Sequence, residues 1–216
     1  MRVVAISAVV VLCAVSLAAG CADSDQKTGA ADGAKRLAVE DLRPLVTVSP
    51  EATGWRWDVE PQTRLLTPPP RLDEAEPSYA IQRALTDAYA DAGLVKAATS
   101  SWWDNASVKK ASSFANLVAT PEAAKAALQA ENNFAYHWFP EFEQQEIREI
   151  EADGIGEESW AVQGGGVEGG FVEIGWRRAN AVLAVYVNCR PCQSDLADAA
   201  RRWAKTIDDA ARAAVD

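Results

Sequence analysis

The chain has 216 residues, of which 49% are hydrophobic, and its formal net charge at pH 7 is −10, from 21 Lys and Arg against 31 Asp and Glu. This acidic balance argues against nucleic acid as a partner, because nucleic-acid-binding domains present a basic surface to the phosphates. It also argues against a hold on anionic lipid headgroups through surface charge, since such a hold requires clusters of Lys and Arg.

The first twenty residues have the pattern of an export signal. Arg2 supplies a short positive region, residues 3–19 form an apolar run without a charge, and Gly20-Cys21 closes the run before a polar stretch. A retained transmembrane anchor is the alternative, but the run is slightly short for the roughly 20 apolar residues that a spanning helix needs. We therefore expect residues 1–20 to be a signal peptide.

The end of this segment, with the sequence LAAGC, resembles the lipobox of bacterial lipoproteins. The resemblance implies cleavage before Cys21 and attachment of acyl chains to that cysteine, which would anchor the protein to the extracytoplasmic face of the cell membrane. The sequence departs from the family pattern at Ala18, where Leu is usual, and Leu17 stands one residue earlier. Two or more acyl chains hold a protein firmly, whereas one chain binds only marginally.

The cysteine count fits this interpretation. Of four cysteines, Cys13 leaves with the signal peptide, and three remain, which is an awkward number in an oxidising compartment. If Cys21 carries lipid, Cys189 and Cys192 are left as one pair and no thiol is free. We therefore predict a disulfide between Cys189 and Cys192.

Residues 22–36 are small and polar without periodicity, which predicts a flexible tether that spans on the order of 20 Å as a coil. Residues 37–216 are long enough for a single domain with a hydrophobic core. Its first part, 37–72, is expected to be an irregular N-terminal arm, with room for a short strand within 42–50, another around Trp55 and Trp57, and an extended proline-rich end.

Three segments have the apolar spacing of amphipathic helices, at about 78–92, 120–132 and 196–214. The first is followed by Gly93, which suits the left-handed position after a helix. The second opens with Thr120-Pro121, a cap followed by a proline at the first helical position. The third has the clearest apolar stripe, made by Leu196, Ala200, Trp203, Ile207, Ala211 and Ala214.

The remaining segments are expected to be strands, at 94–103, 108–118, 158–163, 169–177 and 181–188. The stretch 141–151 fits either a strand or a helix, and we favour an edge strand. Turn residues separate them, including a Gly164–Gly166 loop and a tight turn at 177–180. Short hairpin connections force antiparallel pairing. We predict an α+β fold: a mostly antiparallel sheet meander with helices packed on one face and a C-terminal amphipathic helix.

Three stretches, FANLVATPEAAKAAL, GIGEESWAV and VEIGWRRANAVLAVYV, followed by the terminal helix, are similar to a family of actinobacterial extracytoplasmic domains. These domains occur as small lipoproteins and as the outer sensor domains of some serine/threonine kinases. The resemblance covers about residues 78–214. It implies a PsbP-like or kinase-sensor-like domain of sheet and helices, without known catalysis. Those sensor domains often carry two disulfides, whereas this chain can form only one.

The sequence Cys189-Arg190-Pro191-Cys192 lies between an expected strand and an expected helix, which is the layout of a thioredoxin-like redox site. Only 24 residues follow Cys192, and they fit one helix, so the other elements of a thioredoxin fold have no place. We favour a structural disulfide that ties the strand end to the helix start. A redox-active pair and a metal site that uses the pair are the alternatives.

Other candidate chemistry is sparse. His137 is the only histidine and lies among aromatic residues, where a buried, hydrogen-bonded role is favoured over a ligand or base role. The acidic run from Glu141 to Asp153 is interpreted as a solvated edge strand, with glycosidase carboxylates or a calcium site as alternatives. The Gly164–Gly166 stretch lacks the Lys-Ser/Thr of a phosphate loop. No cofactor and no metal are expected.

Eight tryptophans are an unusual number for this length. Four fit core positions: Trp103, Trp160, Trp176 and Trp203. Four are harder to place and form a candidate binding surface, because exposed tryptophan stacks on sugars or grips apolar ligands and partners: Trp55, Trp57, Trp102 and Trp138.

The sequence thus predicts a lipid-anchored, extracytoplasmic protein with a non-catalytic, sensor-like domain. Its partners would be the membrane, through lipid on Cys21, and an unknown small apolar or glycan ligand or a protein. The alternative is an extracytoplasmic thiol–disulfide oxidoreductase that uses Cys189 and Cys192.

Overall fold

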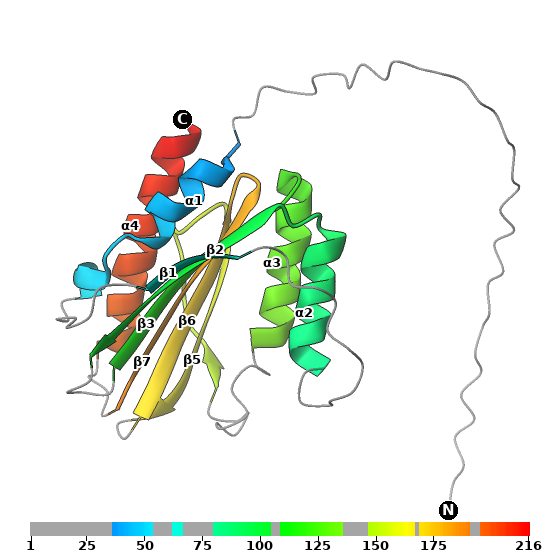
Figure 1. Ribbon diagram of the computed structural model, residues 1–216. Coiled ribbons are helices and arrows are strands. Elements are labelled where there is room, and N and C mark those ends of the chain that lie inside the picture. Colours follow the sequence, from blue (N-terminus) through cyan, green and yellow to red (C-terminus); the bar gives the residue numbers. More distant parts are fainter. Residues whose placement is uncertain are drawn as a thin grey trace, which may run out of the picture. The chain divides into compact units, whose positions relative to one another are not determined.

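A seven-stranded antiparallel sheet forms the centre of the structure, a computed structural model (Figure 1). The strands lie in the order β1-β2-β3-β7-β6-β5-β4. They are β1 (Gln62–Leu66), β2 (Lys96–Asp104), β3 (Lys109–Leu117), β4 (Arg148–Glu149), β5 (Glu158–Gly166), β6 (Gly169–Arg178) and β7 (Ala181–Cys189). The structure describes residues 36–53, 62–66, 80–104, 109–135, 147–166, 169–190 and 195–216.

Helices flank the sheet, and all described residues belong to one compact unit, Ala34–Asp216. They are α1 (Val39–Val46), the short 3-10 helix η1 (Pro50–Thr53), α2 (Ala80–Asp91), α3 (Pro121–Ala135) and α4 (Leu196–Val215). Among the residues described, no helix is both long enough and apolar enough to cross a membrane. The predicted α+β class, with an antiparallel sheet and a C-terminal helix, is confirmed.

The helices cover both faces of the sheet, so the prediction that they pack on one face is wrong. Helices α1 and α4 contact each other and pack on β2, β3, β6 and β7, whereas α3 contacts α2 and packs on β5, β6 and β7. Figure 1 shows the two pairs on opposite sides of the sheet. The reason lies in β7, which is almost entirely buried along Ala181–Cys189. A strand that is apolar on both faces must be covered on both.

The larger core lies on the α1/α4 face. The α4 stripe packs there against β2, β3, β6 and β7. Trp203 is fully buried, meets Trp102 edge-on with ring centroids 5.4 Å apart, and donates its indole N–H to the Val48 carbonyl oxygen at 3.0 Å. The buried indole therefore has both its apolar surface and its polar group accommodated.

A second core lies on the α2/α3 face. Helix α3 contributes Ala124 and Leu128, and the strands contribute apolar side chains such as Val162 and Phe171. Phe171 stacks on Tyr186 of the neighbouring strand with ring centroids 6.0 Å apart. This core is the smaller of the two, and it borders the polar residues described below.

The N-terminal arm is more regular than the sequence indicated. Its described part forms α1, η1 and β1, and β1 pairs with β2 as an additional strand of the sheet. The expectations of an irregular arm and of a short strand within 42–50 are therefore wrong for these residues, because α1 covers Val39–Val46. Helix α1 buries Leu42, Leu45 and Val46 in the larger core, which explains why a segment with Pro44 inside it is helical. The strand expected around Trp55 and Trp57 falls outside the described residues.

The turn between β6 and β7 binds the segment at Leu37, which precedes α1, to the sheet through hydrogen bonds. Ala179 adopts a left-handed backbone with φ of 51°, and Asn180 beside it is 5% exposed. The Asn180 side chain accepts a hydrogen bond from Leu37 N at 2.9 Å and donates to the carbonyl oxygens of Leu37 and Val118. One buried amide thus joins three segments that are far apart in sequence.

The other end of the sheet differs from the sequence prediction in one place. Gly164–Gly166 belongs to β5 and pairs with Gly169–Phe171 of β6, so it is not a connecting loop. Gly164 is required because a Cβ there would lie 2.4 Å from the Phe171 ring. The expected edge strand within 141–151 is described only as Arg148–Glu149, at the outer side of β5.

Candidate functional site

Most of the residues that the sequence singled out lie outside the described part of the chain: Cys21, Trp55, Trp57, His137, Trp138 and Cys192. The lipidation, the disulfide and three quarters of the predicted tryptophan surface therefore stay predictions. Trp102 and Cys189 are described, and their positions can be compared with what the sequence indicated.

Trp102 is not on a surface. Its side chain is 3% exposed and contacts Trp203 in the larger core, so its assignment to a binding surface is wrong. Its neighbour Trp103, which was expected in the core, is only partly buried. Successive side chains of a strand point to opposite faces, and the sequence of two adjacent tryptophans does not reveal which one faces α4.

Cys189 ends β7 and is 3% exposed, within the larger core and opposite Gly170 of β6. A thiol that takes part in disulfide exchange has to be accessible and stabilised as a thiolate. This buried position favours a structural role for the predicted bond to Cys192, within the six residues that separate Cys189 from the start of α4 at Leu196.

The described part of the acidic run is solvated. Glu149, Glu151 and Asp153 are exposed side chains at the β4 edge, as expected for a solvated edge strand. Within the described ranges, no group of three or more His, Cys, Asp or Glu side chains is arranged to hold a metal ion.

The structure instead brings four polar residues together on the α2/α3 face. We call Tyr89 of α2, Asn116 of β3, Glu131 of α3 and Glu173 of β6 the carboxyl cluster. The Tyr89 hydroxyl donates a short hydrogen bond to Oε1 of Glu131, and Asn116 hydrogen-bonds to the same pair of side chains. Glu173 interacts electrostatically with Glu131. Two carboxyl groups therefore face the same space between helix and sheet.

Regular secondary structure carries both acids into the interior. On α3, Ala124, Ala127 and Leu128 form the buried face, and Glu131 occupies the next position of this helical repeat. On β6, Glu173 shares its face with Phe171, which belongs to the second core. Each acid thus stands where the pattern calls for an apolar residue.

Neither carboxyl group is fully compensated. Oε2 of Glu131 and Oε2 of Glu173 are both buried without a hydrogen-bond partner. Burial raises the pKa of Glu131 to about 7, although the hydrogen bonds from Tyr89 and Asn116 lower it. Burial raises the pKa of Glu173 to about 8, and the charge of Glu131 adds to the rise. Burial and Glu131 also raise the pKa of Tyr89 well above its ordinary value. The cluster is therefore able to take up or release protons near neutral pH.

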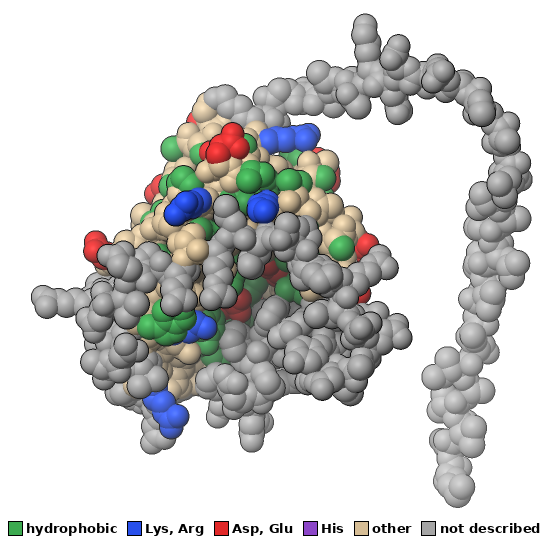
Figure 2. All heavy atoms as spheres, viewed as in Figure 1, with side chains coloured by type: hydrophobic (Ala, Val, Ile, Leu, Met, Phe, Trp, Pro, Cys, Tyr) green, Lys and Arg blue, Asp and Glu red, His purple; other side chains and the backbone are tan. Residues whose placement is uncertain are grey.

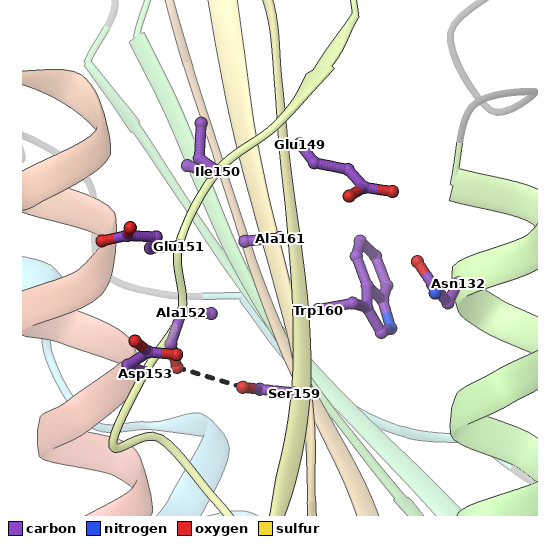
Figure 3. Close-up of a pocket in the computed structure, with 9 residues that line it drawn as sticks. All are labelled: Asn132, Glu149, Ile150, Glu151, Ala152, Asp153, Ser159, Trp160 and Ala161. Carbon is purple, nitrogen blue, oxygen red and sulfur yellow. Dashed lines mark hydrogen bonds between the residues drawn. The ribbon is translucent and has the colours of Figure 1, made fainter.

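A cavity of about 270 Å³ lies at the adjacent β4–β5 edge (Figure 3). Its lining residues are Asn132, Glu149, Ile150, Glu151, Ala152, Asp153, Ser159, Trp160 and Ala161. The Trp160 ring points from β5 toward Asn132 of α3, and Glu149 lies beside it (Figure 3). Asn132 follows Glu131 on α3, so the cavity and the carboxyl cluster both adjoin this helix.

Trp160 links these two features. It lies over Gly175 of β6, where an added Cβ would be 2.5 Å from the indole ring. Gly175 is the next residue after Glu173 on the same face of β6. Trp160 is 9% exposed, and its indole nitrogen is buried without a hydrogen-bond partner. A third unpaired polar group is therefore located next to the two carboxyl groups.

Sequence reasoning missed Glu131 and Glu173. The signal was present: Glu131 falls on the apolar face of the predicted helix, and Glu173 lies in the apolar run FVEIGW. An acid at such a position is solvent-exposed if that face of the sheet is open and is covered if helices pack on it. The predicted packing of helices on one face left this face open, so it did not indicate that Glu131 and Glu173 are covered.

No protein-family model and no curated protein matches the chain. A solved structure does: the extracellular domain of PknH from Mycobacterium tuberculosis has a TM-score of 0.53 and 13% sequence identity. The match covers 82% of this chain and all of that one. At this level of identity the likeness shows a shared fold, and it agrees with the sensor-type fold that the sequence resemblance implied.

Proposed function

We propose that the protein is a lipid-anchored, extracytoplasmic domain that binds a small ligand, as a sensor domain does, and catalyses no reaction. The observation that carries the proposal is the carboxyl cluster, in which Glu131 is buried, Glu173 is half-buried, and one buried oxygen of each lacks a partner. A buried polar group without a partner costs about 1–3 kcal/mol. A ligand that supplies the missing bonds would recover this free energy.

The fold likeness supports the extracytoplasmic part of the proposal, because the matching structure is an extracellular domain. The apolar N-terminus and the LAAGC sequence support export and lipid attachment at Cys21. A tether over residues 22–36 would then hold the domain clear of the membrane. Trp55, Trp57 and Trp138 remain candidates for a second contact surface, with a glycan, an apolar ligand or a protein.

The rival function, thiol–disulfide exchange, fits less well. Cys189 is buried in the larger core, whereas an attacking thiolate must be accessible. The chain also has a single histidine, which leaves little room for Ser–His–Asp or Cys–His machinery. An insulin-reduction assay with the purified protein tests this directly. We expect no activity above background, and rapid turnover would favour the enzyme.

Ligand binding is tested by thermal unfolding of the full-length protein, purified in mild detergent, against a panel of small molecules. The panel holds amines, neutral polyols, dicarboxylates, mono- and disaccharides and short alkyl compounds. A ligand at 100 times its Kd stabilises the folded state by about 2.7 kcal/mol, which raises the Tm of a domain of this size by roughly 5–10 °C. No shift with any class would contradict the proposed function.

The anchor is tested separately. We expect Cys21→Ala to abolish incorporation of a fatty-acid analogue and to shift the protein from the membrane to the medium or to an uncleaved precursor. Cys13→Ala is the matched control, because that cysteine lies within the expected signal peptide. Equal labelling of Cys21→Ala and the unaltered protein would show that Cys21 is not the site of lipid attachment.

A further inference from the structure

The carboxyl cluster contains two acids and no described base that could neutralise them. On β6, the next charged side chain on the same face is Arg177, four residues from Glu173, which is about 13 Å along a strand. Its guanidinium pairs with Glu157 at 2.5 Å and with Glu158 at 3.6 Å. The Trp160 indole lies over Gly175, between Arg177 and Glu173. The two terminal nitrogens of Arg177 are therefore engaged with these acids, and its Nε is buried without a partner.

The other elements around the cluster place few charges near it, among their described residues. Helix α2 presents the neutral Tyr89, β3 presents Asn116, and β7 presents Tyr186, which pairs with Glu173 across the strands. On α3, Lys125 lies six residues before Glu131 and pairs with Glu158 at 2.9 Å.

One lysine of β3 shares this face of the sheet. Lys110 lies opposite Asn188 of β7, two positions along from the row that holds Tyr186 and Glu173. The two acids have raised pKa values, which is the opposite of what an ion pair with Lys110 would produce.

The space is also partly aromatic. Figure 2 shows a hollow on one face of the molecule, with acidic and hydrophobic side chains inside it. The stacked rings of Phe171 and Tyr186 lie on the same face of the sheet as Glu173. An organic cation is attracted by carboxylates and by the faces of aromatic rings. Beyond the two carboxyl groups, the unpaired and buried indole N–H of Trp160 can donate to an acceptor on the same ligand.

We propose that the carboxyl cluster binds a small organic cation of the primary-amine class, whose ammonium group donates to the free oxygens of Glu131 and Glu173. This inference rests on the proposed function and names the chemistry of its ligand. An ammonium group has three donors and no acceptor, which matches two carboxylates that lack donors. A divalent metal fits less well, because Ca²⁺ takes six to eight oxygen ligands and the described cluster offers two carboxyl groups and one amide.

Binding of a cation must displace protons from the two acids. Near pH 7 the raised pKa values leave Glu131 partly and Glu173 mostly protonated. The amine then binds as these protons leave, so its affinity should rise from pH 6 to pH 8, by up to about tenfold per pH unit for each proton released. Tyr89 contributes no proton in this range because its pKa is raised further.

The experiment is isothermal titration calorimetry of the full-length protein in detergent, with putrescine and its uncharged analogue 1,4-butanediol as probes. Titrations at pH 7 in two buffers of different ionisation enthalpy report the number of protons released. The variants are Glu131→Gln and Glu173→Gln, which resemble the protonated acids in shape and charge and so preserve the fold. Glu40→Gln, an exposed acid of α1 on the opposite face, is the matched control.

We expect putrescine to bind with release of at least one proton and butanediol not to bind. Each cluster variant should weaken putrescine binding at least about tenfold, the size of one charge-assisted hydrogen bond, and Glu40→Gln should leave it unchanged. Equal binding of the two probes, putrescine binding that survives both cluster variants, or binding without proton release would overturn the inference. The release measurement needs no variant, so it stands even if one fails to fold.

A control panel separates this inference from the proposed function. If sugars, dicarboxylates, Ca²⁺ or Mg²⁺ bind while putrescine and other primary amines do not, the amine assignment is wrong and a ligand-binding domain remains. If no compound of any class binds, the proposed function itself fails, and the inference fails with it.

Discussion

The two faces of the sheet each bury an acidic side chain, and they treat it in opposite ways. On the α1/α4 face, Asp208 of α4 is fully buried and accepts two hydrogen bonds from Arg178 of β6, at 3.0 and 2.6 Å. On the α2/α3 face, Glu131 and Glu173 have no described cation, and each keeps an unpaired oxygen. On the first face a side chain of the protein neutralises the buried acid, whereas on the second face a proton or a ligand has to do so.

Strand β6 contributes a charged side chain to each face, so the two faces can be compared directly. Arg178 and Glu173 both belong to β6 and point to opposite sides of the sheet. The α1/α4 face has its own unpaired group, the indole nitrogen of Trp176, but that residue is neutral and fully buried. Unpaired charge is confined, among the described residues, to the α2/α3 face. We infer that α1 and α4 hold the domain together and that α2 and α3 cover its functional face.

The largest expected effect comes from breaking the compensated pair. Asp208→Ala leaves the Arg178 guanidinium, whose side chain is 12% exposed, without its main partner. Removing one member of a buried ion pair typically costs about 3–5 kcal/mol of unfolding free energy. Urea denaturation measures the loss. Asp209→Ala, which removes an exposed acid 3.4 Å from Lys205, should change the stability by less than about 0.5 kcal/mol. Equal effects of the two variants would contradict the role assigned to the pair.

The uncompensated acids predict an unusual dependence of stability on pH. Both folded-state pKa values are raised above the ordinary value of 4.5, so the folded protein holds protons that the unfolded chain has lost. Their contribution to stability is complete below about pH 4.5 and is lost as the pH rises through about 7 and 8. At 1.36 kcal/mol per pKa unit, Glu131 alone contributes roughly 3 kcal/mol.

Glu131→Gln is the variant that isolates this effect. It should match the unaltered protein near pH 4.5 and exceed its stability at pH 8, because glutamine never acquires the buried charge. Denaturation curves at pH 4.5, 6, 7 and 8 test whether the two stabilities diverge as the pH rises. A stability that rises steadily from pH 4.5 to 8 in both proteins would show that the two acids are not buried as described.

A smaller effect is expected from the predicted disulfide. The bond between Cys189 and Cys192 closes a loop of four residues, which gives roughly 2 kcal/mol in the chain-entropy model. The double alanine variant should lose about this much stability and keep its putrescine binding, because Cys189 lies in the larger core, away from the carboxyl cluster. Thiol titration before and after denaturation checks the oxidation state. A free thiol in the native protein would contradict the bond.

The last variant, Gly175→Ala, tests the position of the Trp160 ring. Gly175→Ala places a Cβ 2.5 Å from the indole ring, and overpacking of this kind costs about 1–3 kcal/mol. It should also shift the tryptophan fluorescence, because the ring has to move. Gly169→Ala on the same strand meets no atom closer than 3.7 Å and should be close to neutral. If both variants behave alike, Trp160 does not lie over Gly175.

The sequence predicted the elements of this fold better than their arrangement. The apolar stripe from Leu196 to Ala214 and the cap at Thr120 correctly indicated α4 and α3, because helical periodicity is a local property. The packing of helices on both faces was missed, although the uninterrupted apolar sequence of β7 carried that information. Helix α1 was missed because Pro44 and a polar neighbourhood conceal three buried side chains.

The candidate site was less predictable for a physical reason. Whether Glu131 is buried depends on the contact of α3 with α2 and the sheet, which no local pattern encodes. Trp102 and Trp103 show the same limit, since only the tertiary structure decides which of two adjacent residues faces α4. Cys189 was recognised because its spacing to Cys192 is local.

The central claim is that two carboxyl groups lie buried and without a neutralising cation on the α2/α3 face. NMR of the protein labelled with ¹³C at the glutamate carboxyl carbon, titrated from pH 3 to 9, tests it most directly. Glu131→Gln and Glu173→Gln assign the two signals by their disappearance. We predict that these two carboxyl groups titrate near pH 7 and 8 and that their titration moves to lower pH when putrescine is bound. Titration of every glutamate below about pH 5.5 would contradict the claim.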